Sequence, residues 1–322
     1  MRRFAARLVW VTLAVSACGG DSFAPPNGGL TPAELIAEGR RLFFEETFGG
    51  NGRTCGTCHP APDFVIGPAE IAAMPATDPL FGGQLDMDSE AVGRGLFRYP
   101  LGGTGFLDAD ITVMRGVPSI ANLAATGPFL ADGRAERLED LSVDAVLLHA
   151  LDGAADLPGE RIPTEREQAA LAAFQLSVAL PDPDPGDFPG DLENFEGFFL
   201  FTGKARCATC HVGPMFTDND FHNQLACPPR CPPVEDPGRC RIDAGANDCA
   251  LSGMSFNTPQ LRGIGRTAPF FHDNAFGSLE EVVETYNSRA FHESPAATRL
   301  GLGPLDLTPE EIEQLVEFLK AL

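Results

Sequence analysis

The pentapeptide Cys-x-x-Cys-His occurs twice in the chain, beginning at Cys55 and at Cys207. Two thiols at this spacing lie on one turn of chain, where each can form a thioether with a vinyl group of haem, and the adjacent imidazole can bind the iron. A zinc site or a thioredoxin-like redox pair also uses Cys-x-x-Cys, but neither needs a histidine directly after both pairs. The motif therefore predicts two c-type haems, held covalently by Cys55, Cys58, Cys207 and Cys210 and axially by His59 and His211.

Five of the nine cysteines lie outside these motifs. Four of the five share one Pro-rich segment, and in an exported protein they predict two disulfides, with three connectivities open and a zinc site as the alternative. These four are Cys227, Cys231, Cys240 and Cys249.

The N-terminus has the pattern of an export signal. Residues 1–18 contain three arginines, then a short apolar stretch and small residues, and this stretch is too short to span a bilayer as a mature helix. The sequence Val15-Ser-Ala-Cys18 resembles a bacterial lipobox, so we expect Cys18 to be lipidated; ordinary cleavage nearby is the alternative. Residues 19–29 are predicted to form a flexible tether. We therefore expect an exported, periplasmic lipoprotein that meets the membrane only through its lipid.

The composition limits the partners and the architecture. The chain has 322 residues, enough for two domains, and its 35 glycines and 28 prolines predict many loops. The formal net charge of -22 argues against nucleic acid and anionic lipid as partners. It would attract a basic electron-donor protein, although solubility alone explains the charge equally well.

Three helix starts share one cap, in which a threonine is followed three residues later by a glutamate. Apolar residues at helical spacing follow, and amphipathic segments at 35–48 and 192–201 precede the two haem motifs. The caps are Thr31, Thr164 and Thr308.

The chain also contains an internal repeat. Residues 117–140 match residues 258–281 at a constant offset of 141 without a gap, and under this offset Ala145 corresponds to Tyr286. The Pro-rich run 181–186 separates the halves as a linker. These features predict a mainly α-helical fold of two tandem cytochrome c-like domains, residues 30–182 and 187–322, each enclosing one covalently bound haem.

Further motifs accompany the haem pentapeptides: Asp132-Gly-Arg-Ala135 with Leu138-Glu139, His211 to Asn219 with Phe221-His222-Asn223, Thr258-Pro-x-Leu-Arg262, Thr267 to Asp273, and Leu279 to Val283 with Tyr286-Asn287. With these motifs the chain resembles the bacterial di-haem cytochrome c peroxidases and, more closely, their MauG-like relatives. The resemblance covers nearly everything after residue 30. It implies that one haem stays low-spin and relays electrons while the other reacts with peroxide.

The resemblance also implies the sixth ligand of the second haem. In the peroxidases this position holds a methionine and in MauG-like proteins a tyrosine, and the matching residue here is Tyr286, fourteen residues after His272. A phenolate is a hard anionic donor that favours ferric iron and lowers the potential relative to methionine. The alternative is a core tyrosine that is hydrogen-bonded at its tip.

The first haem site departs from the family pattern. Relatives place a glutamine and a glutamate over the reactive iron for acid–base assistance. Here Leu141 stands at the glutamine position, and no glutamate lies between Val146 and Leu151. The tryptophan between the haems of relatives is matched by Ala131, and the one Trp of this chain is in the export signal. These differences put ordinary peroxidase chemistry in doubt.

His149 lies four residues after Ala145, one turn along the same predicted helix, so we expect it to face haem 1. Three roles stay open for this histidine: a sixth iron ligand, a distal acid–base group, or a structural residue. If it binds iron, haem 1 is closed at rest; otherwise haem 1 is open and reactive.

Three further expectations come from the resemblance. His272 and His222 match positions beside or between the haems rather than iron ligands. Relatives hold calcium with the carbonyls of residues matching Thr267 and Pro269 and with an asparagine side chain. Gly116 stands at that asparagine position, which leaves calcium binding open.

Three functions fit these observations. The leading hypothesis is a MauG-like di-haem peroxidase that reduces hydrogen peroxide or another small oxidant at haem 1, with electrons relayed through haem 2 from a small donor protein or an organic substrate. The alternatives are a non-enzymatic di-haem electron carrier and an oxygen-activating di-haem protein. An open iron would separate the first and third functions from the second.

Overall fold

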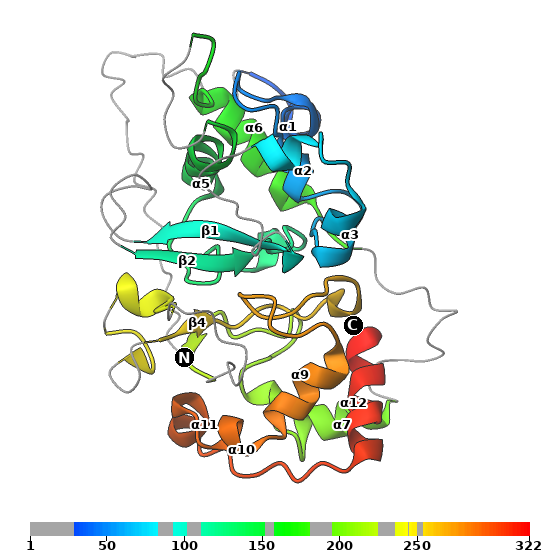
Figure 1. Ribbon diagram of the computed structural model, residues 1–322. Coiled ribbons are helices and arrows are strands. Elements are labelled where there is room, and N and C mark those ends of the chain that lie inside the picture. Colours follow the sequence, from blue (N-terminus) through cyan, green and yellow to red (C-terminus); the bar gives the residue numbers. More distant parts are fainter. Residues whose placement is uncertain are drawn as a thin grey trace, which may run out of the picture.

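The computed structural model describes residues 29–82, 93–101, 111–151, 158–180, 195–224, 236–243, 245–249 and 254–322. Its elements form two helical groups with a β-hairpin between them (Figure 1). The predicted mainly helical fold is confirmed, and the two small antiparallel sheets were not predicted. Residues 1–18, including Cys18, lie outside the described ranges.

The first helical group is built on α1 (Pro32–Glu45) and α6 (Glu165–Ser177), which pack against each other. Gly39 lies at the crossing, where an added Cβ would come 1.9 Å from the carbonyl oxygen of Ala170. Only glycine permits this approach. The group also contains α2 (Cys55–Cys58), α3 (Pro68–Ala73), α5 (Leu138–Ala145), the π-helical turn Val146–Ala150 and the 3-10 turns Pro79–Gly82 and Leu123–Ala125.

The second group repeats this design with α7 (Glu196–Thr202) and the C-terminal α12 (Pro309–Lys320). Gly197 takes the place of Gly39, since a Cβ there would lie 2.2 Å from the carbonyl oxygen of Gln314. The group also contains α9 (Leu279–Tyr286), α10 (Arg289–His292), α11 (Pro295–Leu300) and the 3-10 turns Cys207–Thr209, Arg239–Arg241 and Ile264–Arg266.

The capping boxes predicted at Thr31, Thr164 and Thr308 are confirmed, because each threonine accepts the backbone N–H three residues on and the glutamate there accepts the threonine N–H. The segments predicted to be amphipathic were placed inaccurately. The first helix ends at Glu45, before the predicted limit at residue 48. In the second segment the described helix runs from Glu196 to Thr202.

The internal repeat is visible in the backbone. Helices α5 and α9 begin and end at the same offset of 141 residues. A bridge joins Phe129 to Ala135, and its counterpart joins Phe270 to Phe276 at the same offset. The two halves therefore share local geometry as well as sequence, which supports their origin as copies of one unit.

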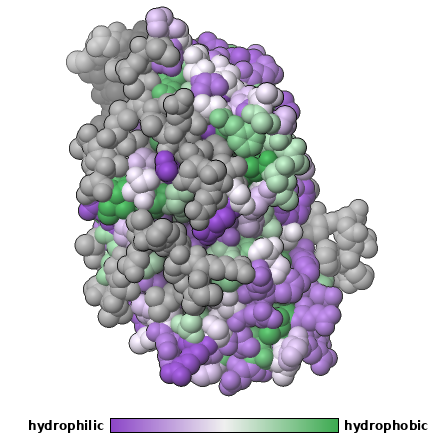
Figure 2. Space-filling model, viewed as in Figure 1, coloured by the Kyte–Doolittle hydropathy of each residue, from purple (hydrophilic) through white to green (hydrophobic). Residues whose placement is uncertain are grey.

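The hairpin between the groups pairs β1 (Leu96–Leu101) with β2 (Ile111–Gly116) in antiparallel register (Figure 1). A second, two-residue pair joins β3 (Phe221–His222) to β4 (Phe256–Asn257). In the visible face of the molecule, hydrophilic residues dominate the second group, while hydrophobic residues gather over the α2–α3 region of the first (Figure 2). Among the described residues, no helix is long and apolar enough to cross a bilayer.

Candidate haem-binding sites

Both pentapeptide histidines are held in the same way. His59 Nδ1 lies 3.0 Å from the carbonyl oxygen of Phe64, and His211 Nδ1 lies 2.9 Å from that of Phe216. A carbonyl can only accept, so Nδ1–H is the donor in both rings and Nε2 keeps the lone pair that a metal needs. Phe64 and Phe216 both have φ 56°, so one left-handed turn positions the acceptor twice.

The surroundings keep both imidazoles neutral. Burial is the main cause and lowers the pKa of His59 to about 4; the hydrogen bond to Phe64 opposes it, and nearby His149 lowers it further. Burial likewise lowers the pKa of His211. A neutral imidazole is the form that binds iron.

The four pentapeptide cysteines are not disulfide-bonded, whereas Cys240 and Cys249 form a disulfide. Burial raises the pKa of Cys55 and of Cys207 to about 12, so both remain protonated thiols. Unbridged thiols on one turn have the chemistry that thioether formation requires. The disulfide matches one pair of the four predicted bridging cysteines; Cys227 and Cys231 lie outside the described residues.

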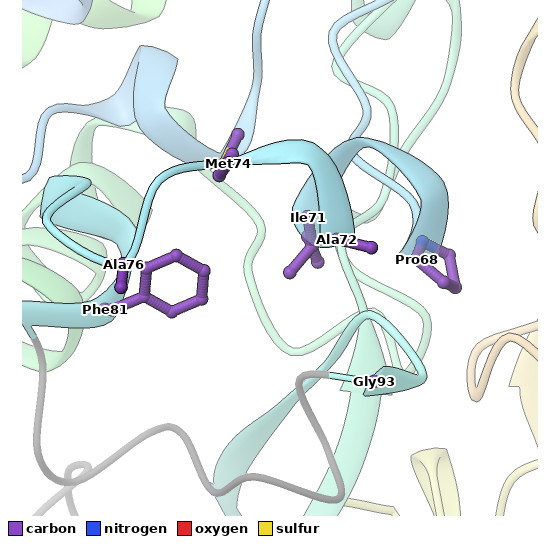
Figure 3. A pocket seen from close by; sticks show the side chains of 7 residues that line it. All are labelled: Pro68, Ile71, Ala72, Met74, Ala76, Phe81 and Gly93. Atoms are coloured by element: carbon purple, nitrogen blue, oxygen red, sulfur yellow. The ribbon is translucent and has the colours of Figure 1, made fainter.

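An apolar cavity of about 450 Å³ lies beside the first pentapeptide (Figure 3). It shares Ile71, Met74 and Phe81 with the apolar cluster against which Cys58 packs. A porphyrin needs apolar walls around its ring, and this lining supplies them. The residues around Cys58 therefore fit a covalently attached haem.

Tyr286 ends α9 beside the second pentapeptide. Its ring packs on Phe291 with centroids 4.9 Å apart, and it belongs to the apolar cluster that also contains Cys207. Its hydroxyl donates a hydrogen bond of 2.7 Å to Oε1 of Gln224. Burial raises the pKa of Tyr286, and the adjacent Cys207 and Cys210 add to this effect. The phenol thus points into the space next to the cysteines that would carry haem 2.

Sequence reasoning missed Gln224 as the partner of Tyr286. The only available signal was its position directly after the motif Phe221-His222-Asn223. The pairing spans 62 positions, and a glutamine in a loop carries no pattern that would identify it.

His149 lies on a different kind of turn from the one predicted. We expected the helix of Ala145 to continue, but α5 ends at Ala145 and the next five residues form a π-helical turn. Single π turns are frequent at functional sites. The turn brings His149 close enough to His59 to lower its pKa, and the role of His149 at haem 1 stays a prediction.

His222 is buried beside the second pentapeptide and has partners at both ring nitrogens. Its Nε2 lies 3.0 Å from Oδ2 of Asp218, and its Nδ1 lies 2.7 Å from a guanidinium nitrogen of Arg299. The arginine must donate, so Nε2–H donates to Asp218. Both Asp218 and His222 affect the pKa of His211, which agrees with the expected role of His222 next to a ligand rather than as one.

His272 lies at the contact between the halves, stacked on Phe256 with centroids 3.8 Å apart and planes at 16°. Its carbonyl accepts the N–H of Gly116 at 2.8 Å. The backbone carbonyl of Ala131 likewise accepts the N–H of Asn257 at 2.8 Å across this contact. The inter-haem position expected for His272 is thus consistent with its place between the two groups.

The absence of a side chain at Gly116 has a structural reason. A Cβ there would lie 2.0 Å from Oδ1 of Asn274, whose amide donates to the carbonyls of Arg94 and Gly95 at 3.1 and 3.0 Å. The carboxamide therefore comes from the opposite half, next to the position at which relatives carry asparagine. Calcium binding stays a prediction.

A buried ion network joins the halves. Arg115 bonds Asp236 through two nitrogens at 2.7 and 2.9 Å and Asp132 through the third at 2.7 Å, and Arg134 also bonds Asp132. Asp132 is fully buried. Burial alone would raise the pKa of Asp132, but Arg115 and Arg134 together lower it.

We expect Asp132→Asn to destabilise the fold by about 3–5 kcal/mol at pH 7, because it removes one partner of a buried charge network. The folded-state pKa of Asp132 is lowered, so its contribution is present above the unfolded-chain pKa of about 3.9 and is lost as the pH falls below it. Urea unfolding at pH 7 and at lower pH checks both points. The exposed Asp140→Asn is the matched control, and equal stability of Asp132→Asn and wild type at pH 7 would contradict the prediction.

Sequence comparison shows that the chain is similar to MauG and to cytochrome-c peroxidases. No family model matches the chain. The chain is 30% identical over 331 residues to the methylamine utilization protein MauG of Methylorubrum extorquens, covering 92% of this chain and 80% of that protein. It is 28% identical over 372 residues to cytochrome-c peroxidase IdrP1 of Denitromonas iodatirespirans, covering 99% and 92%.

Two solved structures, of a MauG-like protein and of a diheme peroxidase, align with most of the chain. A MauG-like protein associated with microbial copper homeostasis aligns with a TM-score of 0.59 and 25% identity, covering 90% of this chain and 88% of that one. The diheme peroxidase BthA of Burkholderia thailandensis, at 20% identity and a TM-score of 0.56, shares the fold, with 91% and 88% covered.

Proposed function

Because the chain belongs to the bacterial family of di-haem cytochrome c peroxidases and MauG proteins, we propose that it is a di-haem c-type oxidoreductase that reduces hydrogen peroxide. The observation that carries the proposal is the repeated unit in which a pentapeptide imidazole donates Nδ1–H to the carbonyl five residues on. One unit lies in each helical group. Residues 30–182 and 187–322 then form the two haem domains of the proposal.

The haems supply iron that exchanges single electrons and binds peroxide. The chain attaches each haem through two thioethers and one imidazole, and the Nδ1–H bond fixes each ring and raises the basicity of Nε2. The attachment residues are Cys55, Cys58 and His59 for haem 1 and Cys207, Cys210 and His211 for haem 2.

Tyr286 is the proposed sixth ligand of haem 2. In the structure its hydroxyl donates to Gln224, and as an iron ligand it would lose this proton to solvent. Burial raises the pKa of Tyr286 and opposes a bare phenolate, so the positive charge of a bound iron would have to stabilise it. The Gln224 carboxamide, which has an N–H as well as an oxygen, would then be the group to donate to the phenolate oxygen. An anionic ligand suits a haem that works at high oxidation levels.

His149 is the proposed acid–base group at haem 1. Relatives have a glutamine and a glutamate in this role, and His149 lies four residues after Ala145, the repeat counterpart of Tyr286. With haem 1 in place, the His149 imidazole would be the group that accepts the proton of peroxide and returns it to the leaving oxygen as water. Its approach to His59 supports this assignment.

The alternative function is a non-enzymatic electron carrier in which His149 caps haem 1. The same approach of His149 to His59 favours it, together with the missing distal glutamine and glutamate. The comparisons favour peroxidase activity over the oxygen-activating alternative.

The remaining assignments concern location and partners. We place the protein in the periplasm, anchored through a lipid on Cys18, and we propose a small donor protein or an organic substrate as electron source. Nucleic acid is not a proposed partner. A calcium ion between the halves would have to use the carbonyls of Thr267 and Pro269 without a side chain at Gly116.

Serine in place of both Cys55 and Cys58 tests the function. We expect the covalent haem content to fall from two per chain to one and peroxide turnover with an artificial donor to be lost, while the haem 2 absorption remains. The variant with serine at both Cys207 and Cys210 is the matched counterpart, and it should keep haem 1. Undiminished peroxide turnover after loss of haem 1 would contradict the assignment of peroxide to that site.

A further inference from the structure

The segment before the first pentapeptide packs directly on the turn that carries His149. The backbone N–H of Asn51 donates to the carbonyl of Ala150 at 2.9 Å. The side-chain amide of Asn51 donates to the carbonyl of His149, also at 2.9 Å. A Cβ at Gly50 would lie 2.0 Å from the carbonyl oxygen of Ala150, so the two segments touch at backbone distance.

Arg53 adds a second bond to the same carbonyl. Arg53 as a whole is 2% exposed, and its guanidinium donates to the carbonyl oxygen of His149 at 3.1 Å and to that of Leu80 at 3.0 Å. A cation at the carbonyl end of a helical turn is favourable, and charge-assisted hydrogen bonds are strong. Arg53 lies two positions before Cys55. It therefore connects the His149 turn and the turn of Leu80 to the segment that leads into the first pentapeptide.

The described residues of the second half do not repeat these bonds. Gly39 precedes Cys55 by sixteen positions, whereas its counterpart Gly197 precedes Cys207 by only ten, so the first half has a longer segment at this point. The residue two positions before Cys207 is an alanine, which has no polar side chain. Helix α9 ends at Tyr286, without a π turn. The bonds from Asn51 and Arg53 thus occur in the first half, where a π turn that contains His149 follows the helix α5.

We propose that Asn51 and Arg53 are positioning residues that hold the His149 turn at haem 1. The inference rests on the proposed role of His149 and deepens it. Both side chains bond the backbone oxygen of His149 and not its imidazole, so they can set the position of the turn without taking part in the chemistry. A reacting group displaced by about 1 Å can cost about 100-fold in rate, so the position of this turn matters.

The test uses the full di-haem protein with Asn51→Ala, Arg53→Gln and Arg53→Lys. We expect Asn51→Ala and Arg53→Gln to slow the reaction of haem 1 with peroxide at least about 10-fold and to change its electron paramagnetic resonance signal, with the haem 2 signal unchanged. Arg53→Lys keeps a cationic donor and should restore much of the loss. Gln168→Ala is the matched control, because Gln168 also donates to a backbone carbonyl, that of Pro163 at 2.9 Å, away from the pentapeptide.

Double variants decide whether the effect passes through His149. We expect Asn51→Ala to have no further effect in a His149→Ala background. An unchanged haem 1 signal and rate in Asn51→Ala, or a fully additive effect in the double variant, would overturn the inference. If Arg53→Gln fails to take up haem, Asn51→Ala carries the test.

Failure of the inference is distinguishable from failure of the proposed function. A wild-type protein inert to peroxide would end the peroxidase proposal. The resonance signal of haem 1 can still be compared between Asn51→Ala, His149→Ala and wild type without any turnover, and identical signals in all three would refute the positioning role.

Discussion

Replacing His149 by alanine is expected to lower the rate constant for the reaction of haem 1 with peroxide by about 10²–10⁴-fold, the range that positioned acid–base groups contribute. The imidazole is the proposed group for moving the peroxide proton, since Leu141 occupies the position of the glutamine of relatives and no glutamate follows before Leu151. Stopped-flow absorption under pseudo-first-order peroxide measures this rate directly.

The control for this variant is His292→Gln. His292 accepts the backbone N–H of Leu305 at 3.2 Å in the second group and has no proposed part in the chemistry. We expect its rate constant to match wild type. A faster reaction in His149→Ala would mean that the imidazole caps the iron and would support the electron-carrier alternative; an equal rate would mean a structural histidine.

Replacing Tyr286 by methionine is expected to raise the reduction potential of haem 2 by roughly 0.2 V or more, within the range of about 0.8 V that axial ligands cover. A neutral thioether favours ferrous iron, whereas a phenolate favours ferric iron. Tyr286→Phe should instead leave the sixth position without a protein ligand and move haem 2 toward high spin. Spectroelectrochemistry and electron paramagnetic resonance measure the two effects.

Tyr99→Phe is the matched control, because Tyr99 is the other tyrosine of the chain and lies in β1 between the helical groups. In Tyr99→Phe, the reduction potential of haem 2 should stay near that of wild type. An unaltered potential in Tyr286→Met would show that Tyr286 is a core phenol whose hydroxyl only serves Gln224.

Features with local causes could be predicted from the sequence. The capping boxes at Thr31, Thr164 and Thr308 depend on residues three positions apart, and they formed as expected. The constant offset of the repeat predicted that Ala145 and Tyr286 would be counterparts, and helices α5 and α9 indeed begin and end at that offset, since the copies share one geometry.

Features that depend on distant contacts could not be predicted. Within the π turn, the carbonyl of His149 accepts from the side chains of Asn51 and Arg53, almost a hundred positions earlier. From the sequence alone, Gly116 indicated that a calcium ligand of the relatives is missing. Only the structure shows that Asn274 of the opposite half lies against this glycine. Neither contact has a sequence period, so no local pattern could reveal it.

The most direct test of the central claim is a stoichiometric hydrogen peroxide titration of the purified di-haem protein, followed by haem absorption in the fully oxidised and half-reduced states. A peroxidase with an open haem 1 should lose its resting ferric bands at about one equivalent of peroxide and recover them when an electron donor is added. Absence of any reaction in both states would contradict this account and would mean that both irons are capped.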